Sequence, residues 1–190
     1  VARGIHSVTT YSLRVNERTP VAGLLREEER LNLERLVRWR AVVRHGALAL
    51  GLVSTRWHTF VRPSSAGERF EDRTGVGEQL GVGMSARSRF GATIYRNHTN
   101  IQTYLDRIES EQSPVEEIFS LGDEDLRLRF IGGSLGEGRP LERAAYMERF
   151  GRALEVDYDE ALTRLRTAGL VTDDGTHVRL TETGALICDL

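Results

Sequence analysis

Three small residues spaced two apart, Gly81, Gly83 and Ser85, form the segment of this chain best suited to contact a ligand through its backbone. Glycine lets the main chain approach another group closely or take positive φ values, and N–H groups in such a loop can bind an anion. Arg87 follows and would add a positive charge. A short glycine motif is also typical of an ordinary surface turn, so both interpretations stay open.

A second segment places Phe60 and Arg62 beside the rigid Pro63. Phe60 could face a ligand while Arg62 pairs with a carboxylate. The alternative is a core phenylalanine and a structural ion pair, which is the more common arrangement for a buried aromatic residue.

The sequence gives little indication of a metal site or a catalytic nucleophile. No two of the five histidines have the i, i+4 spacing of a helical metal site. The one cysteine, Cys188, cannot alone hold an iron–sulfur cluster or a structural zinc. We therefore predict that Cys188 is a small buried apolar residue. All 26 basic residues are arginine, which excludes a lysine Schiff base.

Composition limits the class of protein further. The chain has 190 residues, 39% of them hydrophobic, and a net charge of −2, so it can bury a core in one or two domains. The near-neutral charge argues against nucleic acid or a membrane surface as partner. No apolar run reaches the roughly 18 residues of a membrane span, and no signal peptide opens the chain. We expect a cytoplasmic protein, and a piece of a longer one.

The N-terminal half must position these residues. Residues 5–13 predict a strand, 27–44 a helix that stops at Gly46, and 48–53 a second strand. Strand, helix and strand in this order are typical of a βαβ unit in a parallel sheet. Residues 55–91 lack helical periodicity and predict a long loop, of the kind that is often functional.

The C-terminal half predicts mostly helices. We expect a helix at 101–109 capped by Asn100, a linker at 110–114, and helices at 123–131, 141–150 and 158–168. Asp157 would cap the last of these and Gly169 would end it. A hairpin at 170–180 and a short helix capped by Thr181 complete a winged-helix order. Asp173 and Asp174 at the hairpin tip disfavour DNA binding.

The ordered set of motifs resembles the oxygen-independent coproporphyrinogen III oxidase family of radical S-adenosylmethionine enzymes. Residues 5–13 and Thr19-Pro20 resemble a late barrel strand and the turn after it, and Phe60 to Pro63 resembles the family's "NFARP" segment. Further matches are residues 81–91 with "GxGxGAHSxxxG", Tyr95-Arg96-Asn97 with "YxN", Tyr104-Leu105, and 126–190 with the C-terminal domain, including 148–151, 169–171 and 180–184.

The resemblance implies a [4Fe–4S] cluster held by an N-terminal CxxxCxxC, which cleaves S-adenosylmethionine to a radical that takes hydrogen from the substrate. That cysteine motif is not in this sequence. The sequence therefore predicts that the cluster-binding half, lost from this chain or supplied by another, is the missing partner. Ser85 stands where the family has glycine, Arg87 where histidine or an aliphatic residue is usual, and Thr59 where asparagine is usual. These departures favour a substrate other than the ordinary porphyrinogen.

The predicted fold is α/β, with a partial (β/α) barrel over residues 1–112 and a helical, winged-helix-like domain over 113–190. The predicted function is the C-terminal part of a radical enzyme that decarboxylates, methylates or cyclopropanates a small molecule. A haem-binding module without chemistry and a winged-helix DNA-binding protein are the alternatives. We expect Gly81 and Gly83 to lie beside Phe60 and Tyr11 in one cavity wall, with Arg62 or Arg87 supplying charge. The full set of predicted cofactor- or substrate-binding residues is Tyr11, Phe60, Arg62, Gly81, Gly83, Ser85 and Arg87.

Overall fold

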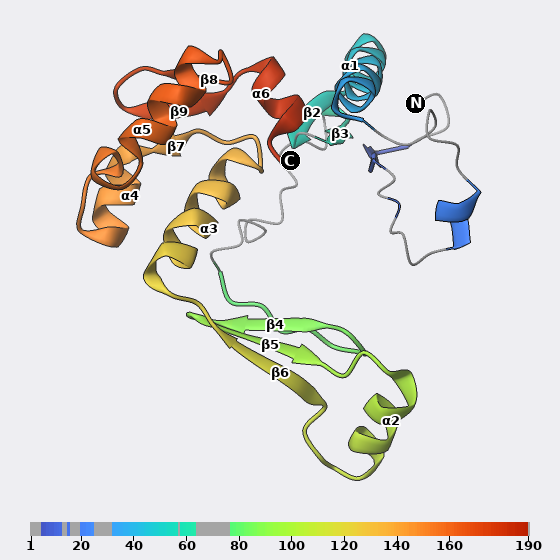
Figure 1. Cartoon of the computed structure of the whole chain (residues 1–190). Helices are drawn as coiled ribbons and strands as arrows, with labels where there is room; N and C mark the ends of the chain where they lie inside the picture. The colour runs from blue at the N-terminus through green and yellow to red at the C-terminus, as the bar shows by residue number, and fades with distance from the viewer. Residues whose placement is uncertain are drawn as a thin grey trace. The chain divides into compact units, whose positions relative to one another are not determined.

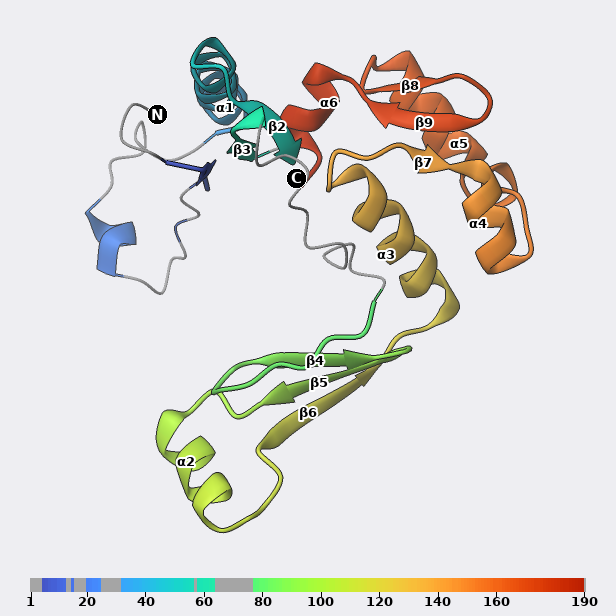
Figure 2. The same cartoon turned by 180° about the vertical axis from the view of Figure 1, so that it is seen from behind.

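A computed structural model of the chain describes residues 5–12, 15, 20–24, 32–56, 58–63 and 77–189. Contacts divide the chain into two units. Unit 1 comprises Val1–Arg69 together with Leu135–Leu190, and unit 2 comprises Phe70–Ser134. Figures 1 and 2 show the elements of both from opposite sides. None of the described helices combines the length and apolarity needed to cross a bilayer.

The N-terminal part of unit 1 is a small sheet and one long helix. Its elements are β1 (Ser7–Thr9), the 3-10 helix η1 (Pro20–Gly23), α1 (Leu33–Ala49), β2 (Val53–Arg56) and β3 (Thr59–Val61). The strands pair antiparallel in the order β1-β3-β2. The predicted parallel pair is therefore wrong for the described strands, because β3 lies between the two strands that flank the helix.

Helix α1 differs from its prediction at both described ends. The side chain of Asn32 caps it by accepting a hydrogen bond from the backbone N–H of Arg35 at 2.8 Å. The helix continues through Gly46, because Ala47, Leu48 and Ala49 are good helix formers. The strand predicted at 48–53 is consequently wrong, and β2 begins only at its last residue. The predicted helix residues 27–31, and Leu13 and Thr19 of the resemblance, lie outside the described residues.

The C-terminal part of unit 1 builds a second sheet on two helices. Its elements are β7 (Leu141–Glu142), α4 (Arg143–Phe150), α5 (Leu154–Thr167), β8 (Val171–Asp173), β9 (His177–Leu180) and α6 (Glu182–Ile187). The sheet order is β7-β9-β8, with all pairs antiparallel. The predicted hairpin and the Thr181 cap, whose hydroxyl accepts from the Gly184 N–H at 3.0 Å, are confirmed.

Two predicted helix starts in this part are wrong. The helix expected from Leu141 begins at Arg143, because Leu141 pairs with Val178 of β9. The helix expected from Tyr158 begins at Leu154 and is interrupted at Tyr158, where φ is −136°. Asp157 is not the cap residue: its carboxylate accepts a hydrogen bond from the Tyr146 hydroxyl at 2.8 Å.

This part of unit 1 buries a continuous apolar core. Tyr146 is 0% exposed, and its ring lies 4.8 Å from that of Phe150 and 6.4 Å from that of Tyr158. The other buried members come from β7, α5, β8, β9 and α6: Leu141, Leu154, Leu162, Val171, Val178 and Leu186. Burying such side chains contributes roughly 1.5–3 kcal/mol each, so this core is the main source of stability here.

A charge cluster and one glycine tie the same elements together. The Arg143 guanidinium donates to both carboxylate oxygens of Asp173 at 2.8 Å and to Glu155 at 2.5 Å. These bonds lower the pKa of both acids. Gly184 of α6 is buried, and a Cβ at this position would overlap the carbonyl oxygen of Leu170. The helix can therefore lie directly against the chain that enters β8.

Unit 2 is a three-stranded meander with two helices. Its elements are β4 (Arg87–Phe90), β5 (Thr93–Asn97), α2 (Ile101–Glu109), β6 (Val115–Ser120) and α3 (Asp123–Leu135), whose last residue belongs to unit 1. The strands pair antiparallel in the order β4-β5-β6. Helix α2 and its Asn100 cap are confirmed. Helix α3 continues past its predicted end through Gly132 and Gly133.

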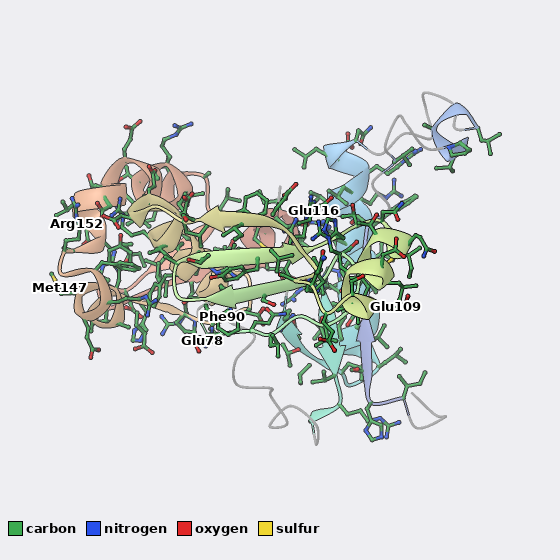
Figure 3. All side chains as sticks on the ribbon, turned by 90° about the horizontal axis from the view of Figure 1, so that it is seen from below. Glu78, Phe90, Glu109, Glu116, Met147 and Arg152 are labelled. Atoms are coloured by element: carbon green, nitrogen blue, oxygen red, sulfur yellow. The ribbon has the colours of Figure 1, made fainter. Side chains whose placement is uncertain are left out.

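The residues predicted as an interdomain linker, 110–114, form the turn between α2 and β6 inside unit 2. The predicted domain boundary at residue 112 falls in this turn, and as a division into domains it stays a prediction. The apolar side chains of unit 2 are largely open to solvent. Phe90, labelled in Figure 3, is 43% exposed, and Ile118 on β6 is 64% exposed.

Candidate functional site

The glycine loop of unit 2, residues 77–86, is held against β4 and β5 by specific bonds. The Gly81 N–H donates to Ser88 Oγ at 3.0 Å. A Cβ on Gly81 would overlap the backbone of Arg87. Glycine is therefore required at this position because two backbone segments touch, and the sequence pattern of close approach is explained by contact within the chain itself.

The second half of the loop turns through unusual backbone conformations. Gly83 has a φ of +103°, and Ser85 has a φ of +60°, which L-residues other than glycine rarely adopt. Two hydrogen bonds hold the turn: Asn97 Nδ2 donates to the Gly83 carbonyl at 2.9 Å, and the Ser85 N–H donates to the His98 carbonyl at 3.0 Å. Serine at a position where the resembled family has glycine thus sits in a glycine-like conformation.

The side chains of the loop face outward. Leu80, Val82 and Met84 are 74%, 83% and 48% exposed, and Arg87 is exposed at the start of β4. The loop therefore presents apolar side chains and one guanidinium on a backbone fixed from behind. That combination can contact an apolar ligand that also carries an acidic group.

Three buried residues hold this loop in place, and the sequence analysis did not select them as site residues. They are the buried polar residues Ser88, Arg89 and Asn97, each 7–8% exposed. Arg89 Nε donates to the Gly77 carbonyl at 2.7 Å, and its backbone pairs with Gln79 at 2.7 and 2.8 Å. Buried polar groups in native proteins are hydrogen-bonded. No periodic pattern along β4 indicated these roles, because Arg87, Ser88 and Arg89 are consecutive polar residues and the two buried ones are neighbours.

The other predicted site residues lie in unit 1: Phe60 is in β3, Arg62 follows β3, and Tyr11 follows β1. Val8 pairs with Phe60 in register, and the Arg62 N–H donates to the His6 carbonyl at 3.0 Å. Phe60 is 1% exposed, whereas Tyr11 is 79% exposed. The Tyr11 ring lies 5.1 Å from the ring of His58. Burial lowers the pKa of His58, and the charge of Arg56 acts in the same direction, so this imidazole is neutral near pH 7.

The predicted set thus falls into two groups. Tyr11, Phe60 and Arg62 lie on or just after strands β1 and β3 of unit 1, whereas Gly81, Gly83 and Ser85 lie in the loop of unit 2 and Arg87 begins β4. Their joining into one cavity wall stays a prediction.

Comparison with known proteins identifies the C-terminal part. Residues 139–187 match the family model for the HemN C-terminal domain. We refer to these residues as the HemN C-terminal domain, after the family model that they resemble. The fold of the chain is similar to that of coproporphyrinogen III oxidase (HemN) from Escherichia coli, a radical SAM enzyme, with a TM-score of 0.66 and 19% identity. The alignment covers 86% of this chain and 41% of that one. No curated protein sequence matches the chain.

The predicted resemblance to the C-terminal portion of the HemN family is confirmed by these matches. The HemN C-terminal domain begins before β7 and ends with α6, so it coincides with the apolar core described above. The mixed α/β composition is confirmed at the level of fold class.

The residues of this chain do not fit a [4Fe–4S] cluster. Such clusters are held by several cysteine thiolates, and the sequence has only Cys188. That residue, predicted to be buried, is exposed, because it lies at the end of α6. Partial covering of its sulfur raises the pKa of the thiol to about 11, which disfavours the ligating thiolate. Within the described residues, no cluster of three or more potential metal ligands exists.

Proposed function

We propose that the chain is the C-terminal part of a HemN-like radical S-adenosylmethionine enzyme acting on a small-molecule substrate. The observation that carries the proposal is the coincidence of two matches: the HemN C-terminal domain over 139–187 and the HemN fold over 86% of the chain. In this family the cluster and S-adenosylmethionine supply a radical that abstracts hydrogen from the substrate. The cluster would be held by residues of the complete enzyme other than these 190.

The part of the reaction assigned to this chain is to shape and orient the substrate. The glycine loop is suited to this because its backbone is fixed by Ser88 and Asn97 while Val82 and Met84 project outward. Arg87 would pair with an acidic group of the substrate. The β1-β3-β2 sheet would belong to the barrel, with Phe60 packed in its core and the exposed Tyr11 available to the substrate. The helices, hairpin and third strand of the HemN C-terminal domain support a winged-helix arrangement used for packing.

A matched pair of glycine variants tests this role in the complete, cluster-loaded enzyme. Gly83 and Gly91 both have positive φ, at +103° and +56°, and both have open space where a Cβ would be. Gly83→Val should abolish turnover while the cluster absorbance stays unchanged, and Gly91→Val, in the β4–β5 turn, should retain turnover. Normal turnover in the Gly83 variant, or equal loss in both variants, would contradict the assignment.

A further inference from the structure

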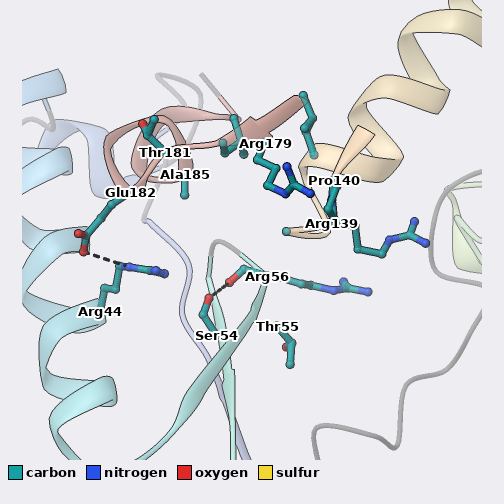
Figure 4. A pocket seen from close by; sticks show the side chains of 13 residues that line it. Arg44, Ser54, Thr55, Arg56, Arg139, Pro140, Arg179, Thr181, Glu182 and Ala185 are labelled. Carbon is teal, nitrogen blue, oxygen red and sulfur yellow. Dashed lines mark hydrogen bonds and ion pairs between the residues drawn. The ribbon is translucent and has the colours of Figure 1, made fainter. Parts of the chain in front are cut away.

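A pocket in unit 1 is lined by four arginines from four different segments. It has a volume of about 430 Å³, which falls in the range of small-molecule sites. Arg44 comes from α1, Arg56 from β2, Arg139 from the segment before β7, and Arg179 from β9. Figure 4 shows Arg44 and Arg139 on opposite sides of the pocket. Glu182 is the acidic residue among the lining side chains.

Contacts between the segments hold the walls of this pocket in place. Arg40 of α1 donates to both carboxylate oxygens of Asp189, at 2.6 and 3.1 Å, and to the Leu186 carbonyl at 2.6 Å, which ties α1 to α6. On the other side, a Cβ on Gly138 would lie 3.4 Å from the Thr55 carbonyl oxygen. The chain that carries Arg139 therefore lies directly on β2. The pocket is thus formed before any ligand binds, which reduces the entropy lost on binding.

The ion pairs of Arg44 and Arg56 involve only one nitrogen of each guanidinium. Arg44 pairs with Glu182 through Nε alone, at 3.3 Å. Arg56 pairs with Glu137 through Nε, at 2.6 Å, which leaves its terminal nitrogens outside this bond. A guanidinium carries five N–H donors, so one ion pair does not saturate it.

The charge balance of the lining favours an anion. Arg179 pairs with Asp174 at 2.6 Å, but both side chains are close to half exposed, and an ion pair of this kind contributes little. Glu137 and Asp174 do not line the pocket, so its wall carries four positive charges and one negative charge. Serine and threonine hydroxyls of Ser54 and Thr181 add polar atoms to the same wall.

We propose that this arginine-lined pocket binds a small molecule that carries at least two carboxylate or phosphate groups. One anionic group would engage Arg44 on its side, and another would engage Arg139 together with Arg56 and Arg179. Guanidinium groups bind both kinds of oxyanion in bidentate fashion. The site stands on the geometry of unit 1 and does not depend on the proposed radical chemistry.

Calorimetric titration of the chain with pyrophosphate and, separately, with propane-1,2,3-tricarboxylate tests the proposal at low ionic strength, where screening is weak. We expect saturable one-to-one binding of at least one probe, and the stronger probe identifies phosphate or carboxylate as the preferred group. The double variant Arg139→Gln/Arg179→Gln should bind that probe roughly 10- to 100-fold more weakly, the effect of losing charged hydrogen bonds. Failure of both probes to saturate at about 10 mM would overturn the proposal.

A charge-matched control separates the site from general attraction. Arg107→Gln/Arg149→Gln removes the same charge from α2 and α4, outside the pocket lining. Equal weakening in the control variant would refute the site. A second measurement needs no variant: the bound probe should protect Arg139 and Arg179 from phenylglyoxal in the unaltered chain, as detected by mass spectrometry. Unchanged modification of both arginines under saturating probe would also refute it.

Discussion

The HemN C-terminal domain and unit 2 contain similar elements, but they bury opposite kinds of side chain. In the C-terminal domain the buried residues are mainly large and apolar, centred on Tyr146. Among the described residues of unit 2, no large apolar side chain is buried, and the buried side chains are the polar ones of Ser88, Arg89 and Asn97. The same chain therefore uses two different ways of stabilising a three-stranded sheet.

The exposed apolar residues show the same contrast. The C-terminal domain exposes Met147, Val156 and Leu165, whereas unit 2 exposes a set spread over the loop, the sheet and both helices: Leu80, Val82, Met84, Phe90, Ile101, Leu105, Ile108, Ile118, Phe119 and Leu128. The comparison teaches that the C-terminal domain is stabilised by its own core, whereas unit 2 depends on backbone pairing and polar bonds.

Hydrogen exchange should show the largest difference between the two regions. Backbone amides of α5 and β9, which lie over the core, should exchange roughly 100-fold or more slowly than those of β5 in unit 2, because local opening exposes less apolar surface in unit 2. Exchange measured by mass spectrometry on the intact chain provides the comparison. Equal protection of the β5 and β9 amides from exchange would contradict the difference in stability between unit 2 and the C-terminal domain.

Two leucine variants test whether apolar side chains contribute differently to stability in the two regions. Leu154 in α5 is 1% exposed and Leu128 in α3 is 49% exposed. Leu154→Ala should lower the free energy of unfolding by about 2–5 kcal/mol, because it leaves a cavity in the core. Leu128→Ala should change it by less than about 1 kcal/mol. Denaturant unfolding measures both, and similar losses would contradict the difference in apolar burial between the C-terminal domain and unit 2.

Substitution of one acidic residue in each region compares the strengths of their ion pairs. Asp173→Asn should cost about 3 kcal/mol, because it leaves the guanidinium of Arg143 without its bidentate partner in a site where Asp173 is 6% exposed. Glu117→Gln, which removes the exposed partner of Arg96 in unit 2, should cost at most about 1 kcal/mol.

The Asp173 effect should depend on pH. The hydrogen bond from Arg143 lowers the pKa of this carboxyl from 3.8. A lowered pKa in the folded state gives stability that is fully present above about pH 4 and is lost as pH falls through the folded value. The difference between wild type and Asp173→Asn should therefore shrink in acid. A difference that is constant from neutral pH to the acid unfolding transition would exclude this linkage.

The smallest effects concern the backbone of the glycine loop. Gly81→Ala should destabilise unit 2 by about 1–3 kcal/mol, because the new methyl group meets the backbone of Arg87. Ser85→Gly should stabilise it by up to about 1 kcal/mol, because glycine adopts the φ of +60° without strain. Thermal unfolding followed in unit 2 measures both, and a destabilised Ser85→Gly variant would show that the serine side chain matters more than the strain.

Local signals in the sequence predicted local structure well. The Asn100 and Thr181 caps and the hairpin at Gly175 are confirmed, since each depends on residues a few positions apart. The errors in predicted secondary structure arise where pairing with a segment distant in the sequence determines the conformation. Leu141 is a strand residue only because β9 lies beside it, and β1 and β2 are separated by β3 because of pairings that no short pattern encodes.

The candidate site was partly predictable for the same reason. Close approach at Gly81 could be inferred from residue type, whereas the roles of Arg89 and Asn97 depend on bonds to Gly77 and Gly83 that form only after the meander has closed. For Phe60, residue type alone could not distinguish a ligand contact from a core position. The structure buries this side chain.

The close approach at Gly184 has a consequence for how this domain can vary. Thr181 donates its N–H and its hydroxyl to the carbonyls of Leu170 and Gly169, at 2.9 and 2.7 Å, and Gly184 touches the first of these carbonyls. Apolar core positions can exchange one hydrocarbon side chain for another, but a methyl group at 184 would push the last helix off the hairpin. The spacing Thr-x-x-Gly after the second hairpin strand should therefore tolerate substitution less than any other part of this domain. We expect the same spacing to be recognisable in the sequences of distantly related domains.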